Sequence, residues 1–134
     1  MKGSIIPYMM FNGETQEAAD FYANLFGLEN VGIRTYADAG VPAPDGYIIH
    51  CHLQRGDFQI MLSDSTEPLP DERGRGLSLT IQCESEEEIN RLYDGLRAEG
   101  TVLMELDDTF WGAKYAKVRD RFGYTWDLNW SKPA

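Results

Sequence analysis

The sequence has few of the residues that carry most nucleophilic and metal chemistry. Among its 134 residues there are only two cysteines and two histidines. Cys51 and Cys83 each stand among apolar, strand-like neighbours, so we expect small buried residues rather than a disulfide or a metal pair. The chain has no G-x-S-x-G motif and no Gly-rich loop that would bind phosphate. The usual sequence signatures of a nucleophilic hydrolase and of a nucleotide-binding protein are therefore missing.

Long apolar segments and an excess of positive charge are also missing. The longest apolar run is far below the roughly 18 residues that span a bilayer, and residues 1–7 contain no apolar stretch of signal-peptide length. We therefore expect a cytoplasmic protein with no membrane contact. The 12 Lys and Arg against 22 Asp and Glu give a net charge of −10. Such a surface repels a polyanion, so we do not expect nucleic-acid binding.

What the chain does contain is an ordinary globular composition with two amphipathic helices. Hydrophobic residues make up 43% and charged residues 25%, which suits one domain over residues 1–134. Apolar residues at helical spacing predict helices at about 15–26 and 86–98. Ser85 and Glu88 form the S-x-x-E pattern of a capping box at the start of the second helix.

The two helices belong to a repeat. Their apolar stripes superpose at a constant distance of 71 residues, so that Ile89 corresponds to Ala18 and Leu96 to Leu25. Each helix follows one strand-like run and precedes three more. The expected strands are 4–11, 31–37, 47–54 and 58–63 in the first half, and 77–83, 101–106, 113–119 and 124–130 in the second.

This order predicts an α+β protein made of tandem β-α-β-β-β modules, about 1–64 and 76–131. They are joined by a linker at 64–76 with two prolines, two glycines and several charges. One helix can cover only one face of its sheet. Two modules side by side would form one curved mixed sheet of eight strands, with the helices outside and a concave trough inside. We expect a small-molecule ligand in that trough.

Six sequence blocks, in this order along the chain, resemble PhnB-like proteins of the vicinal oxygen chelate superfamily (glyoxalase/bleomycin resistance/dioxygenase). The blocks are PYMMFNG at 7–13, AADFY at 18–22, HCHL at 50–53, IMLSD at 60–64, DTFWG at 108–112 and KVRDRFGYTW at 117–126. The resemblance implies the glyoxalase/bleomycin resistance/dihydroxybiphenyl dioxygenase fold and a homodimer.

The resemblance implies no single reaction. The superfamily includes metal-dependent isomerases, dioxygenases and thiol transferases, and also drug-sequestering proteins without catalysis. PhnB-like chains are often labelled 3-demethylubiquinone methyltransferases. Since this sequence has no Gly-rich strand-to-helix loop of the kind that a methyl-donor site uses, we do not expect that activity.

The superfamily's metal ligands come from the first and last strands of each module, and are His or Glu. The matching positions here are Pro7, Ser78, Asp127, and either Ile60 or Met61. Only Asp127 is a credible ligand. We therefore expect no metal at the usual site and no other cofactor.

A substitute metal site is the alternative. His50 and His52 stand two residues apart on one predicted strand, so their rings share a face. The opposite face would carry Ile49, Cys51 and Leu53. If the imidazoles point into the trough with Asp127, two His and one carboxylate could hold a divalent ion. Otherwise the two histidines line the pocket as hydrogen-bonding groups.

The repeat places Tyr115, Lys117 and Arg119 on the second-half strand that corresponds to the histidine strand. Cationic and phenolic groups there suit a polar or anionic ligand, although Lys117 and Asp127 could equally form a plain salt bridge. Trp111 either stacks on a ligand at the trough mouth or anchors its loop.

Our expected function is small-molecule binding without a catalytic residue that the sequence identifies. The alternative is a metal-dependent lyase, isomerase or dioxygenase. The expected ligand-binding residues are His50, His52, Trp111, Tyr115, Lys117 and Asp127.

Overall fold

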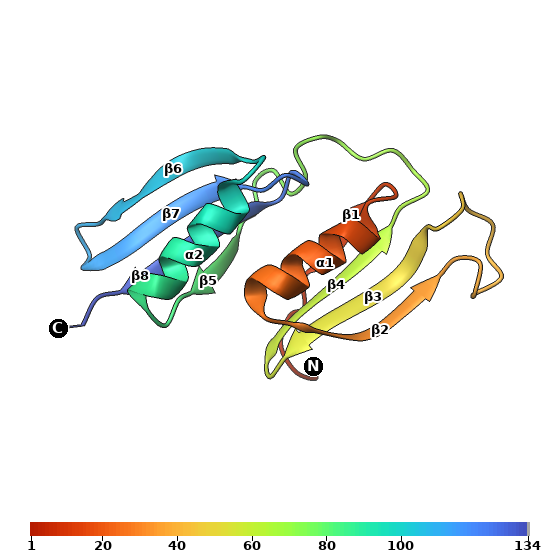
Figure 1. Cartoon of the computed structure of the whole chain (residues 1–134), viewed down its shortest axis with the longest axis horizontal. Coiled ribbons are helices and arrows are strands. Elements are labelled where there is room, and N and C mark those ends of the chain that lie inside the picture. The colour runs from red at the N-terminus through yellow and green to blue at the C-terminus, as the bar shows by residue number, and fades with distance from the viewer. Residues whose placement is uncertain (134) are drawn as a thin grey trace. The chain divides into compact units, whose positions relative to one another are not determined.

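The two apolar stripes form the helices α1 (Thr15–Phe26) and α2 (Glu86–Arg97). In the computed structural model, which describes residues 1–133, each helix belongs to a different compact unit (Figure 1). The first unit is Met1–Leu69 and the second is Pro70–Ala134. Each predicted module falls within one unit, and their union into one domain stays a prediction. Among the described residues no helix is long and apolar enough to span a membrane.

Each unit has a four-stranded mixed sheet with the same strand order. In the first unit, β1 (Tyr8–Phe11) pairs in parallel with β4 (Phe58–Asp64), and the order is β1-β4-β3-β2. The order β5-β8-β7-β6 repeats it in the second unit. The remaining strands are β2 (Glu29–Thr35), β3 (Ile48–Arg55), β5 (Leu79–Gln82), β6 (Thr101–Asp108), β7 (Ala113–Arg119) and β8 (Thr125–Ser131).

The β-α-β-β-β repeat is therefore confirmed, and the fold class with it. The single sheet of eight strands is not what the structure shows. Within residues 1–133, the strands form two sheets of four, and no hydrogen-bonded ladder joins one sheet to the other. Sequence pattern gives the strands of each half, but it contains no information on pairing between the halves.

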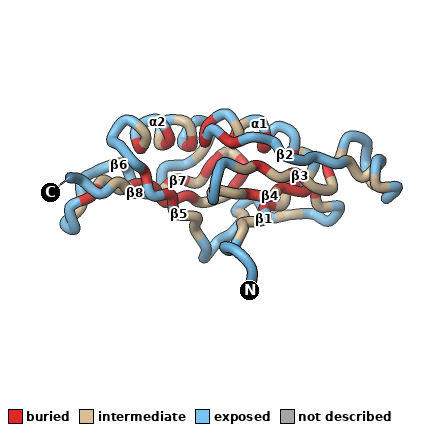
Figure 2. The backbone as a smooth tube through the Cα atoms, turned by 90° about the horizontal axis from the view of Figure 1, so that it is seen from below, coloured by how far each residue is buried: buried red, intermediate tan, exposed pale blue. Residues whose placement is uncertain are grey.

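In both units the helix covers one face of the sheet and the core lies between them. Buried residues follow the strands beneath the helices and the inner side of each helix (Figure 2). The other face of each sheet carries most of the partly exposed polar side chains, because successive side chains on a strand point to opposite faces. Any site built on a sheet must lie on that second face, which we call the open face.

The two strands β3 and β7 show how closely the units correspond. Their patterns of buried and partly exposed residues coincide over seven positions. Ile48, Cys51 and Leu53 are buried on β3, as Ala113, Ala116 and Val118 are on β7. On this correspondence His50 matches Tyr115, and His52 matches Lys117.

The predicted burial of one residue on β3, Ile49, is wrong. We expected Ile49 beside Cys51 and Leu53 on the helix side, but Ile48 is the buried residue and Ile49 is only partly buried. The spacing of three between Ile48 and Cys51 accompanies a register shift in the ladder with β2. An irregularity of this kind puts an extra residue between two inward positions. His50 and His52 keep their shared open face.

Both cysteines are buried free thiols, as expected. Burial raises the pKa of Cys51 to about 11 and that of Cys83 to about 12. Both thiols therefore stay protonated near neutral pH and act as small core residues.

The buried carboxylate of Asp64 organises the first unit. Its Oδ1 accepts hydrogen bonds from the backbone N–H of Gly13 (2.7 Å) and Thr15 (3.2 Å) and from the Thr15 hydroxyl (2.7 Å). Its Oδ2 accepts one from the N–H of Ile48 at 2.8 Å. Glu14, the residue before α1, makes no side-chain cap. Asp64 therefore supplies the cap of α1 from the end of β4, and it also fixes the start of β3.

We predict that Asp64→Ala destabilises the protein by about 3 kcal/mol or more, because several buried donors lose their acceptor together. Asp45→Ala, at an exposed position, is the control and should change stability by less than about 0.5 kcal/mol. Urea unfolding followed by circular dichroism measures both. Equal midpoints for the two variants would contradict this role of Asp64.

Candidate functional site

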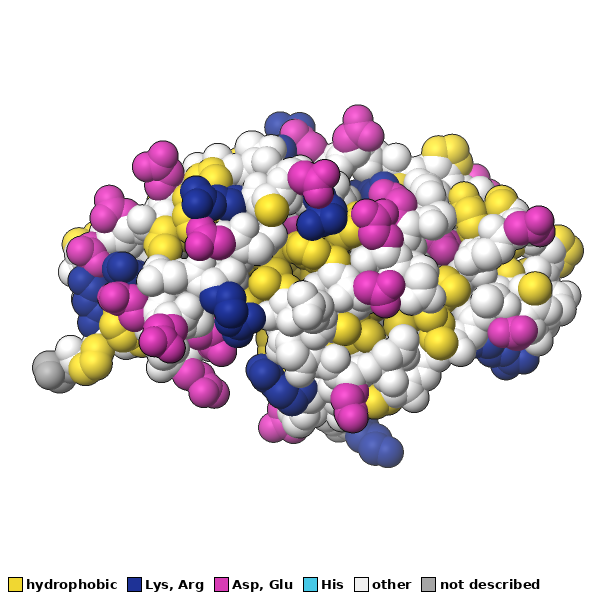
Figure 3. Space-filling view, viewed as in Figure 1, with side chains coloured by type: hydrophobic (Ala, Val, Ile, Leu, Met, Phe, Trp, Pro, Cys, Tyr) yellow, Lys and Arg dark blue, Asp and Glu magenta, His cyan; other side chains and the backbone are white. Residues whose placement is uncertain are grey.

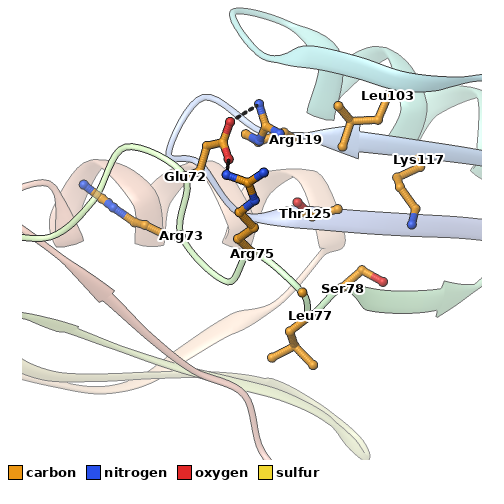
Figure 4. Close-up of a pocket in the computed structure, with 10 residues that line it drawn as sticks. Glu72, Arg73, Arg75, Leu77, Ser78, Leu103, Lys117, Arg119 and Thr125 are labelled. Carbon is orange, nitrogen blue, oxygen red and sulfur yellow. Dashed lines mark ion pairs between the residues drawn. The ribbon is translucent and has the colours of Figure 1, made fainter.

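The open face of the second sheet carries a pocket of about 430 Å³. Its wall comes from β6 (Leu103), β7 (Lys117 and Arg119) and the start of β8 (Thr125), together with the segment 72–78 that leads into β5 (Figure 4). All of these residues belong to the second unit.

The segment that closes this pocket is held against the turn between β7 and β8. The N–H of Arg73 donates to the carbonyl of Gly123 at 2.9 Å. Gly123 has φ +91°, and a Cβ atom there would lie 2.1 Å from the Asp71 carbonyl oxygen. Only glycine allows this approach. We infer that Gly123 positions the segment 70–78 beside the sheet.

The pocket lining is basic although the protein is acidic. Four of the chain's 12 Lys and Arg line it, and Glu72 is the only acidic residue in the lining. Elsewhere acidic side chains are dispersed, as one face of the molecule shows (Figure 3). The basic residues are Arg73, Arg75, Lys117 and Arg119.

Glu72 lies between two of these cations. Its carboxylate oxygens are 3.6 Å from Nη1 of Arg75 and 3.5 Å from Nη1 of Arg119. Figure 4 shows both ion pairs, and it shows the Arg73 side chain pointing away from them. The guanidinium groups of Arg75 and Arg119 thus converge on one carboxylate.

Lys117, which also lines the pocket, faces the buried carboxylate of Asp127. Its Nζ lies 3.6 Å from Oδ1 of Asp127, and the Ser78 hydroxyl donates to Oδ2 at 2.7 Å. Asp127 Oδ1 is buried, and the Lys117 ammonium and the Tyr115 phenol are the polar groups near it. Burial raises the pKa of the nearby Tyr115 to about 12, and the Asp127 carboxylate adds to the shift. The Tyr115 phenol therefore stays neutral.

Trp111 lies in the turn between β6 and β7 and is half exposed. Its ring meets that of Tyr115 edge-on, with centroids 5.9 Å apart, and that of Phe110 at 4.9 Å. Neither Trp111 nor Tyr115 lines the pocket. The structure thus brings Trp111, Tyr115, Lys117 and Asp127 together along β7 and β8, with Lys117 as the member that reaches the pocket.

The two histidines lie on the open face of the first unit. His50 Nδ1 is 2.8 Å from the Tyr8 hydroxyl, and His52 Nε2 is 2.8 Å from Oε1 of Gln59. Burial raises the pKa of Tyr8, so that phenol is neutral too. Both imidazoles therefore pair with uncharged groups. Within the first unit as described, no third His, Cys, Asp or Glu joins them in a metal-binding group.

Comparison with known proteins agrees with this architecture. Residues 3–129 match the family described as 3-demethylubiquinone-9 3-methyltransferase. The chain belongs to this family. Its PhnB-like fold is that of the vicinal oxygen chelate superfamily, as the motif blocks indicated.

Solved structures and a curated relative support the assignment. Protein PA1353 from Pseudomonas aeruginosa is 33% identical, with a TM-score of 0.89 over 98% of this chain and 100% of that one. The PhnB protein from Bacillus cereus is 30% identical, with a TM-score of 0.84 over 96% and 99%. Protein YjdN from Escherichia coli (strain K12) is 28% identical over 92% of both chains.

The superfamily's usual metal site does not fit the residues of this PhnB-like chain. Asp127 already pairs with the Lys117 ammonium, whose positive charge disfavours a divalent cation beside the same carboxylate. The ladders pair Lys117 with Asp127 and His52 with Met61, so Met61 is the first-unit counterpart of Asp127. A thioether is a poor ligand for a hard divalent ion. Ile60, the other candidate position, is buried.

Sequence reasoning missed most of the pocket's charge. Glu72, Arg73 and Arg75 lie in the segment that we interpreted as a linker. Arg119 was expected on the same strand as Lys117, among groups that suit a polar or anionic ligand, but it was not among the expected ligand-binding residues. A signal was present: E-R-G-R at 72–75 puts three charges into four residues. In this chain the segment borders the open face of the second sheet, so its charges belong to the candidate site.

We predict that Lys117→Met lowers stability by about 1 kcal/mol, because it leaves the Asp127 carboxylate without its cation. Partial exposure of Lys117 keeps the effect at this modest size. In a Lys117→Met, Asp127→Asn double variant the loss should shrink, since no charge is left to compensate. Urea unfolding of wild type, Lys117→Met, Asp127→Asn and the double variant gives the coupling energy between the two side chains. A coupling of zero would show that the pair is not an interacting ion pair.

Proposed function

We propose that this PhnB-like protein binds a small molecule in the pocket on the open face of its second sheet, without a resident metal ion. The pocket carries the proposal. Its volume of about 430 Å³ lies in the range typical of small-molecule sites, roughly 300–1,000 Å³. Leu77 and Leu103 offer apolar contact, and Ser78 and Thr125 offer hydroxyl groups.

We do not propose methyl transfer, although the family description names it. The backbone amides at both strand-to-helix turns donate to side chains of the chain itself. Those of Gly13 and Thr15 bind Asp64, and that of Glu88 binds the Ser85 hydroxyl at 3.1 Å. These turns therefore do not offer those amides to a cofactor.

A metal-dependent lyase, isomerase or dioxygenase remains the alternative outcome of the experiment. It would need one divalent ion held by His50, His52 and Asp127. The neutral partners of the histidines and the ion pair of Asp127 support metal-free binding instead.

The experiment is a thermal-shift screen of small metabolites on chelator-treated protein. We expect at least one compound to raise the melting temperature, because a ligand selective for the folded state stabilises it. Thr125→Trp should fill the pocket and abolish the shift. Thr101→Trp, at an exposed position outside the lining, is the matched control and should retain it.

Elemental analysis of the untreated protein decides the alternative. We expect no stoichiometric metal. About one divalent ion per chain, lost on both His50→Ala and Asp127→Ala, would overturn the metal-free proposal. A screen in which every hit survives Thr125→Trp would overturn the proposed pocket.

We also propose that the protein is a homodimer in the cytoplasm. Each sheet has an edge strand with exposed apolar side chains: Val31 and Ile33 on β2, and Val102 and Met104 on β6. Exposed apolar edge strands favour association.

We predict a mass of two chains by light scattering. Replacing Val102 and Met104 with Lys should shift the protein towards one chain, because it places charge on the edge. A monomeric parent protein would contradict the proposal.

A further inference from the structure

Glu72 lines the pocket and pairs with two of its cations. Its carboxylate lies between Arg75, three residues along the same segment, and Arg119 on the sheet. The two guanidinium groups thus already share one oxyanion, which the chain itself supplies.

This internal oxyanion is held loosely. Its distances of 3.5 and 3.6 Å exceed the roughly 2.7–2.9 Å of a strong charge-assisted hydrogen bond. The Arg75 side chain is 87% exposed and that of Glu72 is 45% exposed, so water competes for both. Ion pairs of this kind contribute little to stability. Glu72 can therefore leave without disrupting the second unit.

The backbone that carries Glu72 is held in place, since the Arg73 N–H donates to the Gly123 carbonyl at 2.9 Å. Glu72 can therefore leave the arginines by rotation of its half-exposed side chain alone. Arg119, in contrast, is fixed on β7 and its side chain is only 27% exposed. One arginine is thus positioned by the sheet, and the carboxylate that covers it sits on a loop.

Resting on the function proposed above, we propose that the ligand carries a carboxylate or phosphate-like oxyanion that replaces the Glu72 carboxylate on Arg119 and Arg75. The Glu72 carboxylate then competes with the ligand for the two arginines and lowers the affinity of the pocket for that ligand. Guanidinium groups suit this role because their planar N–H forks bind two oxygens at once.

The rest of the pocket fits such a ligand. Lys117 adds a further positive charge on the same strand as Arg119, and Leu77 and Leu103 can contact an apolar remainder. Arg75, Lys117 and Arg119 line the pocket, and their nearby carboxylates are Glu72 and Asp127. In a chain with net charge −10 this excess of positive charge is a local reversal of sign. A reversal of this kind concentrates small anions at the site.

The experiment measures binding of phenyl phosphate and benzoate by titration calorimetry, with phenol as the neutral probe of the same ring. Glu72→Gln keeps the side chain's size and removes its charge. Glu87→Gln, on the exposed surface of α2, is the control for the change in net charge. Arg119→Gln tests the fixed cation, and its thermal unfolding is measured to confirm that it folds.

We expect an anionic probe to bind wild type and phenol not to bind. Glu72→Gln should lower the dissociation constant at least about threefold, and Glu87→Gln should not change it. Arg119→Gln should raise it about tenfold or more. The use of two anionic probes distinguishes a carboxylate site from a phosphate site.

Two results would overturn the inference. One is unchanged or weaker binding in Glu72→Gln. The other is that neither anion binds wild type or Glu72→Gln although hits from the metabolite screen still occupy the pocket. That result would leave the proposed function standing. If no hit of the screen depends on the pocket, the proposed function fails and this inference fails with it.

Discussion

The structure depends on one constraint: a single helix can cover only one face of a four-stranded sheet. Side chains alternate along each strand, so burying Cys51 and Leu53 beneath α1 obliges His50 and His52 to point the other way. The same rule on β7 buries Ala116 and Val118 and turns Lys117 and Arg119 outward. The site is therefore a consequence of how the core forms, and its chemistry is set by whichever residues occupy the outward positions.

Duplication then allows the two open faces to carry different chemistry on one scaffold. At corresponding positions the first unit has His52 beside Met61, and the second has Lys117 beside Asp127. The first unit's imidazoles pair with neutral groups, whereas the second unit's Lys and Arg pair with carboxylates. The same fold thus supports a hydrogen-bonding face in one unit and an ionic pocket in the other.

Periodicity was sufficient to predict the helices and the β-α-β-β-β order of elements along each half, because burial of one face leaves a regular pattern in the sequence. It failed where contacts are tertiary. The role of Asp64 as a cap for α1 depends on atoms 49 residues away, and the shift from Ile49 to Ile48 depends on an irregular ladder. Glu72 and Arg75 stand in a segment without periodicity, so nothing local could relate them to Arg119.

Charge explains why the pocket of this PhnB-like chain differs from a metal centre. A metal site needs several anionic or neutral donors around one cation. Here the arrangement is reversed, since Lys117, Arg75 and Arg119 are cations whose nearby carboxylates are Asp127 and Glu72. Asp127 is buried and hydrogen-bonded to Ser78, so its pairing with Lys117 is structural. Glu72 is exposed and lies on a loop, which makes its place the one that an anion from solution can take. The Lys117–Asp127 pair and the exposed Glu72 thus both support the proposed binding of an anion on this open face.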